Sequence, residues 1–217
     1  MGANRTSGQP GRRSQYGTDS GEGLDVSILI LGLVIFLGVH SIRIVAGDWR
    51  TQQIARLGAG PWKGLYALAS LVGLVLIVYG FGLARAQPVI LWMPPVWMRH
   101  LAALLTIPAF VLLAAAYVPG NRMKAALGHP MVAGVKLWAF AHLLANGTLA
   151  AAVLFGAFLV WAMVYFTSAR QRDRAAGIRY PAGASKGDAV TMVVGLIAWA
   201  AFAFLLHGWL IGVRPLG

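Results

Sequence analysis

Long apolar runs separated by short polar loops constrain this chain more than any other feature of its sequence. A helix needs about 20 mostly apolar residues to cross the hydrocarbon core of a bilayer, so such runs predict membrane-crossing helices. We expect six of them, at about 26–46, 62–84, 96–118, 130–145, 149–167 and 189–212. The fourth run is short for a span and is expected to be tilted or buried among the others. The sequence therefore predicts an all-α, polytopic membrane helix bundle.

Composition supports a membrane protein and excludes several other classes. Hydrophobic residues make up 59% of the chain, above the roughly 45–50% of soluble domains. The formal net charge of +12 comes from basic residues scattered between apolar runs, so no nucleic-acid partner is expected. The absence of cysteine excludes disulfides, iron–sulfur clusters, thiolate-ligated haem and cysteine zinc sites. Histidine is then the main candidate ligand for any metal or haem.

Two polar segments flank the first predicted span. Residues 1–24 are rich in Gly, Ser, Arg and Gln, which predicts a disordered tail, native or vector-derived, ahead of a transmembrane domain over 25–217. After the span, Trp49, Ile54 and Leu57 alternate with polar residues, which predicts a short helix lying on the membrane surface. Basic residues are concentrated in the odd-numbered loops, so the positive-inside rule places those loops in the cytoplasm and both termini outside.

Protonatable residues inside the predicted spans are the main candidates for a functional site, because they are costly at bilayer depth. His40 and Arg43 are three residues apart in the first span and lie on neighbouring parts of one face. The fourth span holds His129, Lys136 and His142 in an otherwise apolar run. His129 and Lys136 are aligned on a face towards the cytoplasmic half, and His142 lies on a face nearer the middle of the bilayer.

One interpretation joins these residues into a haem site. Neutral imidazoles of His40 and His142 would ligate the iron from opposite sides, and Arg43 and Lys136 would neutralise the propionates. His129, at the start of its helix, would have either a helix-starting role or a role in the site.

Structural roles for the histidines are the alternative. The histidines of the first and fourth spans could hydrogen-bond Ser41, Asn146 or backbone carbonyls and hold helices together. His100 and His207 are expected near the external interface, where structural hydrogen bonding is favoured over metal binding or proton relay.

Four segments together carry a resemblance to a known family. They are LGLVIFLGVHSIRIV, RLGAGPWKGLYALASLVGLVLIVYGFGLAR, PPVWMRHL and GHPMVAGVKLWAFAHLLANGTLA. From about Ile28 to its end, the chain resembles the NnrU family of bacterial membrane proteins, which is named for an association with nitrite and nitric oxide metabolism in denitrifying bacteria. The resemblance implies a multi-pass protein of the bacterial inner membrane, and the charge asymmetry then makes its termini periplasmic.

The same landmarks are similar to those of plant zeta-carotene isomerase, which binds haem b and isomerises a carbon–carbon double bond. Its histidines in F-H-S-G, R-H-P and A-H contexts fall on His40, His129 and His142. This resemblance implies haem b ligated by His40 and His142. The chain departs from that pattern at Gly128, where the relative has arginine, and at Ala139, where it has cysteine.

Functions from three classes are consistent with these residues. The first is a haem b protein that handles nitric oxide, transfers electrons, or acts as a carotenoid-type cis–trans isomerase on a polyene. The second is a transporter or channel whose His, Lys and Arg side chains line a polar path. The third is an assembly factor for a nitrite or nitric oxide reductase, without a cofactor. A membrane methyltransferase is disfavoured because the C-terminal acidic and Arg/Glu cofactor signature is missing.

Overall fold

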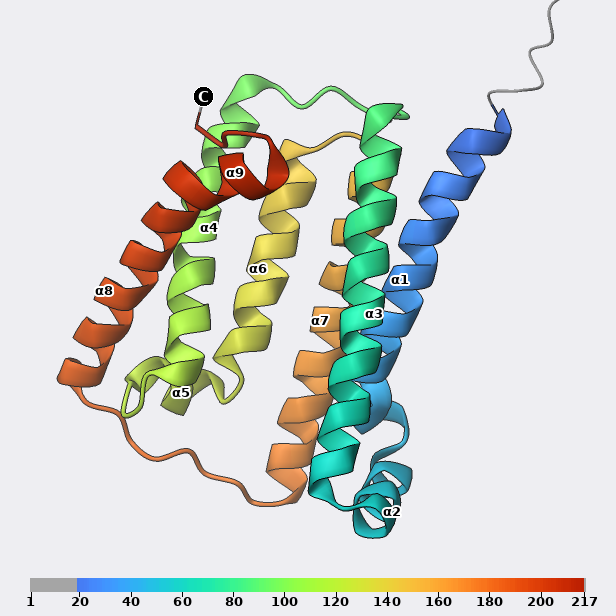
Figure 1. Cartoon of the computed structure of the whole chain (residues 1–217). Helices are drawn as coiled ribbons and strands as arrows, with labels where there is room; N and C mark the ends of the chain where they lie inside the picture. The colour runs from blue at the N-terminus through green and yellow to red at the C-terminus, as the bar shows by residue number, and fades with distance from the viewer. Residues whose placement is uncertain (1–18, 217) are drawn as a thin grey trace, which may run out of the picture.

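A computed structural model of the chain describes residues 19–216, with side chains described from residue 25 onward (Figure 1). Residues 1–18 of the predicted tail lie outside the described residues, and residues 19–24 form the first turns of the first helix. The elements are α1 (Asp19–Val45), α2 (Gly47–Leu57), α3 (Ala59–Ala86), α4 (Val96–Tyr117), α5 (Arg122–Leu127), α6 (Pro130–Ala145), α7 (Leu149–Ala175), α8 (Ser185–Ala201), the π-helical turn η2 (Phe202–Leu206) and α9 (His207–Ile211).

The described part of the chain holds five helices that are long and apolar enough to cross a membrane. They are α1 from Asp25, α3, α4, α7, and the continuous helix Ser185–Ile211 formed by α8, η2 and α9. Helix α6 has 16 residues, fewer than a perpendicular span needs, yet it runs beside the others (Figure 1). The predicted polytopic membrane bundle is therefore confirmed, including its short fourth helix.

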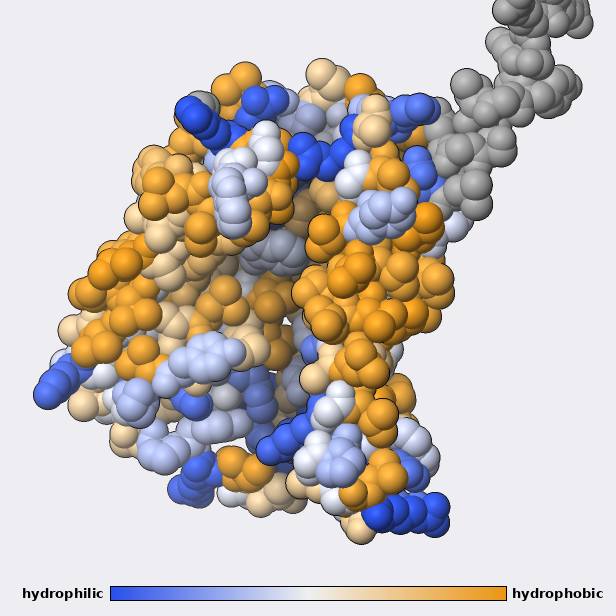
Figure 2. All heavy atoms as spheres, viewed as in Figure 1, coloured by the Kyte–Doolittle hydropathy of each residue, from blue (hydrophilic) through white to orange (hydrophobic). Residues whose placement is uncertain are grey.

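The outer surface of the bundle is apolar over much of its height. Figure 2 shows hydrophobic residues spread over the sides of the helices and hydrophilic residues gathered towards both ends. Large apolar side chains such as Leu68, Val78 and Leu205 stay exposed, each with at least 60% of its surface accessible. A surface of this kind is typical of helices that face lipid, where side chains need no protein partner.

The helices form two groups that share α7 as a common wall. Helices α1, α3 and α7 pack around a core that includes Leu29, Leu33, Ile77 and Phe155. Helix α4 packs against α6 and α8 in the second group, and α7 contacts α6 as well as α1 and α3. Between α1 and α6, no described Cα atoms lie within 8 Å of each other. Figure 2 shows the surface hollowed between the two groups, on the face where α6 and α3 stand apart.

Glycines bring α1 and α3 into close contact. A Cβ atom at Gly73 would lie 2.7 Å from the Phe36 nitrogen, and one at Gly32 would lie 2.6 Å from the Ile77 nitrogen. Any side chain at these positions would force the two backbones apart, because packed interiors leave no room for an added carbon. The close contact fixes the height of His40 on α1 relative to α3.

Polar contacts connect the groups at the end of the bundle that carries α9, here called the α9 end. The Leu91 and Trp92 amides donate to the Gly147 carbonyl at 2.7 and 3.1 Å, so the α3–α4 loop pairs with the α6–α7 turn. The Arg85 guanidinium donates to the Ile211 carbonyl at 2.8 Å and joins the end of α3 to α9. The opposite end, which carries α2 and α5, is here called the α2 end (Figure 1).

The structure differs from the sequence prediction in four local features. Residues 19–24, predicted as part of the disordered tail, are helical and continue α1 towards its start. Segment 121–128, predicted as a loop, contains the short helix α5, because the Asn121 side chain accepts the Lys124 amide at 2.7 Å and caps its start. Helix α7 continues to Ala175, past the predicted end at residue 167. The last predicted helix is interrupted by η2 just before His207. The predicted surface helix is present as α2, which buries none of its residues.

Candidate functional site

His40 lies on α1 among aromatic rings from three helices. Its ring stacks on Phe36 with 4.3 Å between centroids and has edge contacts with Tyr66 of α3 and Trp161 of α7. Its Nδ1 atom lies 2.7 Å from the Phe36 carbonyl oxygen. A carbonyl only accepts, so Nδ1 carries a proton, and in this tautomer the lone pair is on Nε2. No described residue hydrogen-bonds that Nε2 atom.

His142 on α6 has the same arrangement. Its Nδ1–H donates to the Trp138 carbonyl at 2.8 Å, one turn earlier in the helix, and within the described chain Nε2 again has no hydrogen-bond partner. The ring lies 4.6 Å from the Phe155 ring of α7 and 4.9 Å from that of Trp138. The amide of Asn146 donates to the His142 carbonyl and not to the imidazole. The imidazole hydrogen bond is therefore local to α6 and does not tie helices together.

Both histidines contact aromatic residues of α7, so their positions can be compared along this helix. His142 contacts Phe155 and His40 contacts Trp161, six residues further along α7. At 1.5 Å per residue the two contact points are about 9 Å apart along the helix axis. Phe158 lies between them and contacts one aromatic ring on α1 and one on α6. The histidines thus lie along one aromatic wall at different heights.

A pocket of about 300 Å³ lies next to His40 at the α2 end, between α1, α2, α3 and α7. It is lined by three cations, Arg43, Arg50 and Lys63, one from each of the first three helices. The side chains of these cations form no hydrogen bond or ion pair with any residue that the structure describes. A pocket of this composition is suited to an anionic group.

Trp161 contributes an unusual donor beside His40. Its indole Nε1–H is buried and has no acceptor, the one such side-chain atom among the described residues. A buried donor without a partner costs about 1–3 kcal/mol. The ring packs against Tyr165, which lines the basic pocket. An acceptor from a bound molecule would remove this cost.

Lys136 does not share the basic pocket. Its ammonium group lies 5.0 Å from the centroid of the Phe166 ring on α7, within cation–π range. The sequence aligned Lys136 with His129 by helical periodicity and paired it with Arg43 in neutralising the propionates of a haem. In the structure Arg43 lines the pocket beside His40, Lys136 lies over the Phe166 ring, and His129 is hydrogen-bonded to Asp173.

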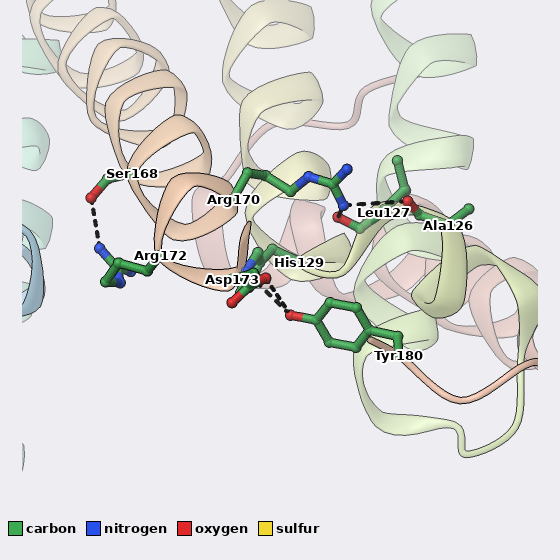
Figure 3. A network of polar contacts seen from close by, with 8 residues as sticks. All are labelled: Ala126, Leu127, His129, Ser168, Arg170, Arg172, Asp173 and Tyr180. Atoms are coloured by element: carbon green, nitrogen blue, oxygen red, sulfur yellow. Dashed lines mark hydrogen bonds and ion pairs between the residues drawn. The ribbon is translucent and has the colours of Figure 1, made fainter. Parts of the chain in front are cut away.

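His129 belongs to a polar cluster at the α2 end (Figure 3). Its Nε2–H donates to an oxygen of Asp173 at 2.8 Å, and the Tyr180 hydroxyl donates to the same oxygen at 2.7 Å. Arg170, one turn before Asp173, donates to the Leu127 carbonyl at 3.1 Å and caps the end of α5. The cluster fastens the start of α6 to the end of α7 and to the α7–α8 loop.

Tyr180 is a stable donor in this cluster. Burial and the hydrogen bond to Asp173 raise the pKa of its hydroxyl from the usual 10.0 to about 12, because both disfavour the phenolate. Its ring also explains the glycine before His129: Gly128 has φ +73°, and a Cβ there would lie 2.7 Å from the Tyr180 ring. Glycine at position 128 therefore has a local conformational and steric cause. The sequence prediction missed both Asp173 and Tyr180. The one signal that could have indicated this cluster is that Asp173 is an acidic residue within a basic segment.

The remaining histidines are at the α9 end. His207 follows η2 and donates its Nδ1–H to the Val213 carbonyl at 2.6 Å. His100 is exposed near the start of α4, and its side chain has no hydrogen bond or ring contact with another described residue. Among residues 25–216, no three His, Asp or Glu side chains gather as a metal-ion site would require. His40 and His142 each keep one ring nitrogen without a hydrogen-bond partner among the described residues.

Comparison with known proteins gives one match. A family model described as "NnrU protein" matches residues 28–215, which include every candidate residue discussed above. No curated protein matches the chain, and no solved structure does so either.

Proposed function

The chain belongs to the NnrU family, and from this premise we propose that it is a bacterial inner-membrane protein that binds haem b through His40 and His142. One shared feature carries the proposal: each imidazole donates Nδ1–H to the carbonyl four residues earlier and leaves Nε2 free. Histidines that ligate metals are held in this way, because the outer hydrogen bond fixes the tautomer and makes the ligating nitrogen more basic.

Three further features support a planar cofactor between the two helix groups. The described Cα atoms of α1 and α6 stay more than 8 Å apart, so the two histidine-bearing helices are not packed directly against each other. Aromatic rings along α7 provide an apolar wall against which a porphyrin can pack. The unpaired Trp161 donor beside His40 is expected where a bound molecule supplies the acceptor.

The proposed roles of the residues follow from this arrangement. His40 and His142 bind and orient the cofactor, Arg43 neutralises carboxylate charge, and the rings around Phe158 exclude water. When bound, haem b supplies a redox-active iron able to bind nitric oxide or a double bond. Nitric oxide and polyenes are both apolar, and both can reach the site laterally through lipid. The proposal thus covers nitric oxide handling and redox-controlled cis–trans isomerisation of a polyene, as the two resemblances imply.

We also propose an orientation, with the α2 end in the cytoplasm and both termini in the periplasm. The α2 end carries most basic residues that lie outside the spans or at their ends, among them Arg50, Arg56, Arg122, Lys124, Arg170, Arg172, Arg174 and Arg179. Basic loops of this kind remain on the cytoplasmic side. Figure 1 has the start of α1 and the C-terminus at the opposite end.

The test of the proposal is the absorption spectrum of the detergent-purified protein from haem-replete cells, combined with a pyridine haemochrome assay. We expect a Soret band that sharpens on dithionite reduction, with distinct α and β bands, and about one haem b per chain. A colourless protein would overturn the proposal and favour a transporter or a cofactor-free assembly factor.

A further inference from the structure

The pocket beside His40 holds positive charge without a described counterion. Arg43, Arg50 and Lys63 come from α1, α2 and α3 and line the same pocket of about 300 Å³. Salt bridges in the described chain involve other residues, namely Arg122 with Asp188 and His129 with Asp173. Three cations around one cavity repel one another, so the arrangement is stabilised when an anion enters.

The position of the pocket links it to the proposed haem ligand. His40 itself lines the pocket, together with Tyr66 and Tyr165. A group bound at His40 would therefore lie next to the three cations of this pocket. The pocket also lies at the end of the bundle, beside the surface helix α2, where charged groups keep contact with water.

Lys136, which the sequence assigned to charge neutralisation, is less suitable for this purpose. It is absent from the pocket lining, and its ammonium group is held over the Phe166 ring at 5.0 Å. Arg50 lies in the predicted surface helix, and Lys63 lies at the start of the second predicted span. Their convergence with Arg43 depends on the way α2 folds back between α1 and α3 (Figure 1).

We infer that Arg43, Arg50 and Lys63 bind the two propionate carboxylates of haem b, an inference that rests on the proposed function. Arginine presents a planar fork that matches a carboxylate, and a lysine ammonium adds a compact charge. In this arrangement the role of α2 would be to position Arg50 beside Arg43 and Lys63. The ligating histidines and the carboxylate-binding cations are separate groups, so they can be tested separately.

The experiment compares two porphyrins on the full-length protein in detergent. Haem b and its dimethyl ester, whose propionates carry no charge, are titrated into haem-depleted protein and followed by the Soret band. The variants are Arg50→Gln, Lys63→Gln and the double variant. Arg56→Gln is the matched control, because Arg56 is an exposed arginine of α2 outside the pocket.

We expect each pocket variant to weaken binding of haem b about tenfold, in line with charge-assisted hydrogen bonds. The dimethyl ester should bind wild type and variants equally, with the same histidine-ligated spectrum, which also shows that the variants are folded. Arg56→Gln should change neither affinity.

Three results would overturn the inference. If wild type and the pocket variants bind haem b with equal affinity, these cations do not bind its propionates. An equal loss for haem b and the ester would show that they act on the fold or on another anion, such as a lipid phosphate. Wild type that binds neither porphyrin would refute the proposed function itself, whereas the first two results leave haem ligation intact.

Discussion

The rings of His40 and Trp161 lie 6.2 Å apart between centroids and almost perpendicular, at 88°, one on α1 and the other on α7. Beside this contact the indole N–H of Trp161 is buried without an acceptor. The pair therefore combines a free imidazole nitrogen with an unpaired donor at one place in the bundle. The proposed function uses both groups, because a bound molecule could ligate to the imidazole and accept from the indole N–H.

Trp161→Phe tests whether a ligand uses the indole N–H. The variant removes an unsatisfied donor from the ligand-free protein, so its melting temperature without haem should fall little. It also removes a donor to the bound molecule, so the rise in melting temperature on adding haem b should be smaller than in wild type. The measurement is a thermal melt in detergent with and without haem b. An identical rise in both proteins would contradict the role of Trp161.

Tyr180→Phe tests the cluster that holds α6 to α7. Loss of the hydrogen bond to Asp173 should destabilise the protein by about 1 kcal/mol at neutral pH. The folded-state pKa of Tyr180 is raised to about 12 from 10.0, so its contribution is complete below pH 10 and is lost as the pH rises towards 12. Melting temperatures of wild type and variant should therefore converge between pH 10 and 12. A constant difference over that range would show that the hydroxyl proton is unimportant.

Gly73→Ala tests how α1 is positioned against α3. The new Cβ would lie 2.7 Å from the Phe36 nitrogen, so the helices must separate and His40, one turn beyond Phe36, must move with α1. We expect a loss of about 1–3 kcal/mol, as for other overpacked contacts, together with weaker haem binding. Gly82→Ala is the control, because a Cβ at Gly82 meets nothing within 4 Å. Comparable melting temperatures for the two variants would contradict the close packing.

Most of the fold could be predicted from the sequence, because span length and apolarity dominate in a membrane protein. The apolar runs predicted the long helices, and the short run at 130–145 predicted α6. Helix α5 and the extension of α7 were missed, since they depend on local capping such as Asn121 and on partners distant in the chain. The π-helical turn before His207 has no periodicity signal in an apolar segment.

The candidate site was predictable only in part. His40 and His142 stand out because histidine is rare in apolar spans, but nothing in the sequence gives their separation along α7. The sequence could not predict that Arg50 lies beside Arg43 and Lys63, because this depends on how α2 folds back towards α1 and α3. The Asp173 and Tyr180 contacts to His129 join residues 44 and 51 positions apart in sequence, which no local pattern reveals.

Electron paramagnetic resonance of the ferric protein, recorded for wild type and for His40→Ala, His142→Ala and His207→Ala, tests ligation most directly. Wild type and His207→Ala should share one low-spin spectrum typical of two imidazole ligands, because His207 is assigned no role in haem binding. His40→Ala and His142→Ala should each lose haem or shift it to a high-spin form. A low-spin spectrum that survives in both of these variants, or disappears in His207→Ala, would contradict the assignment of His40 and His142 as the ligands.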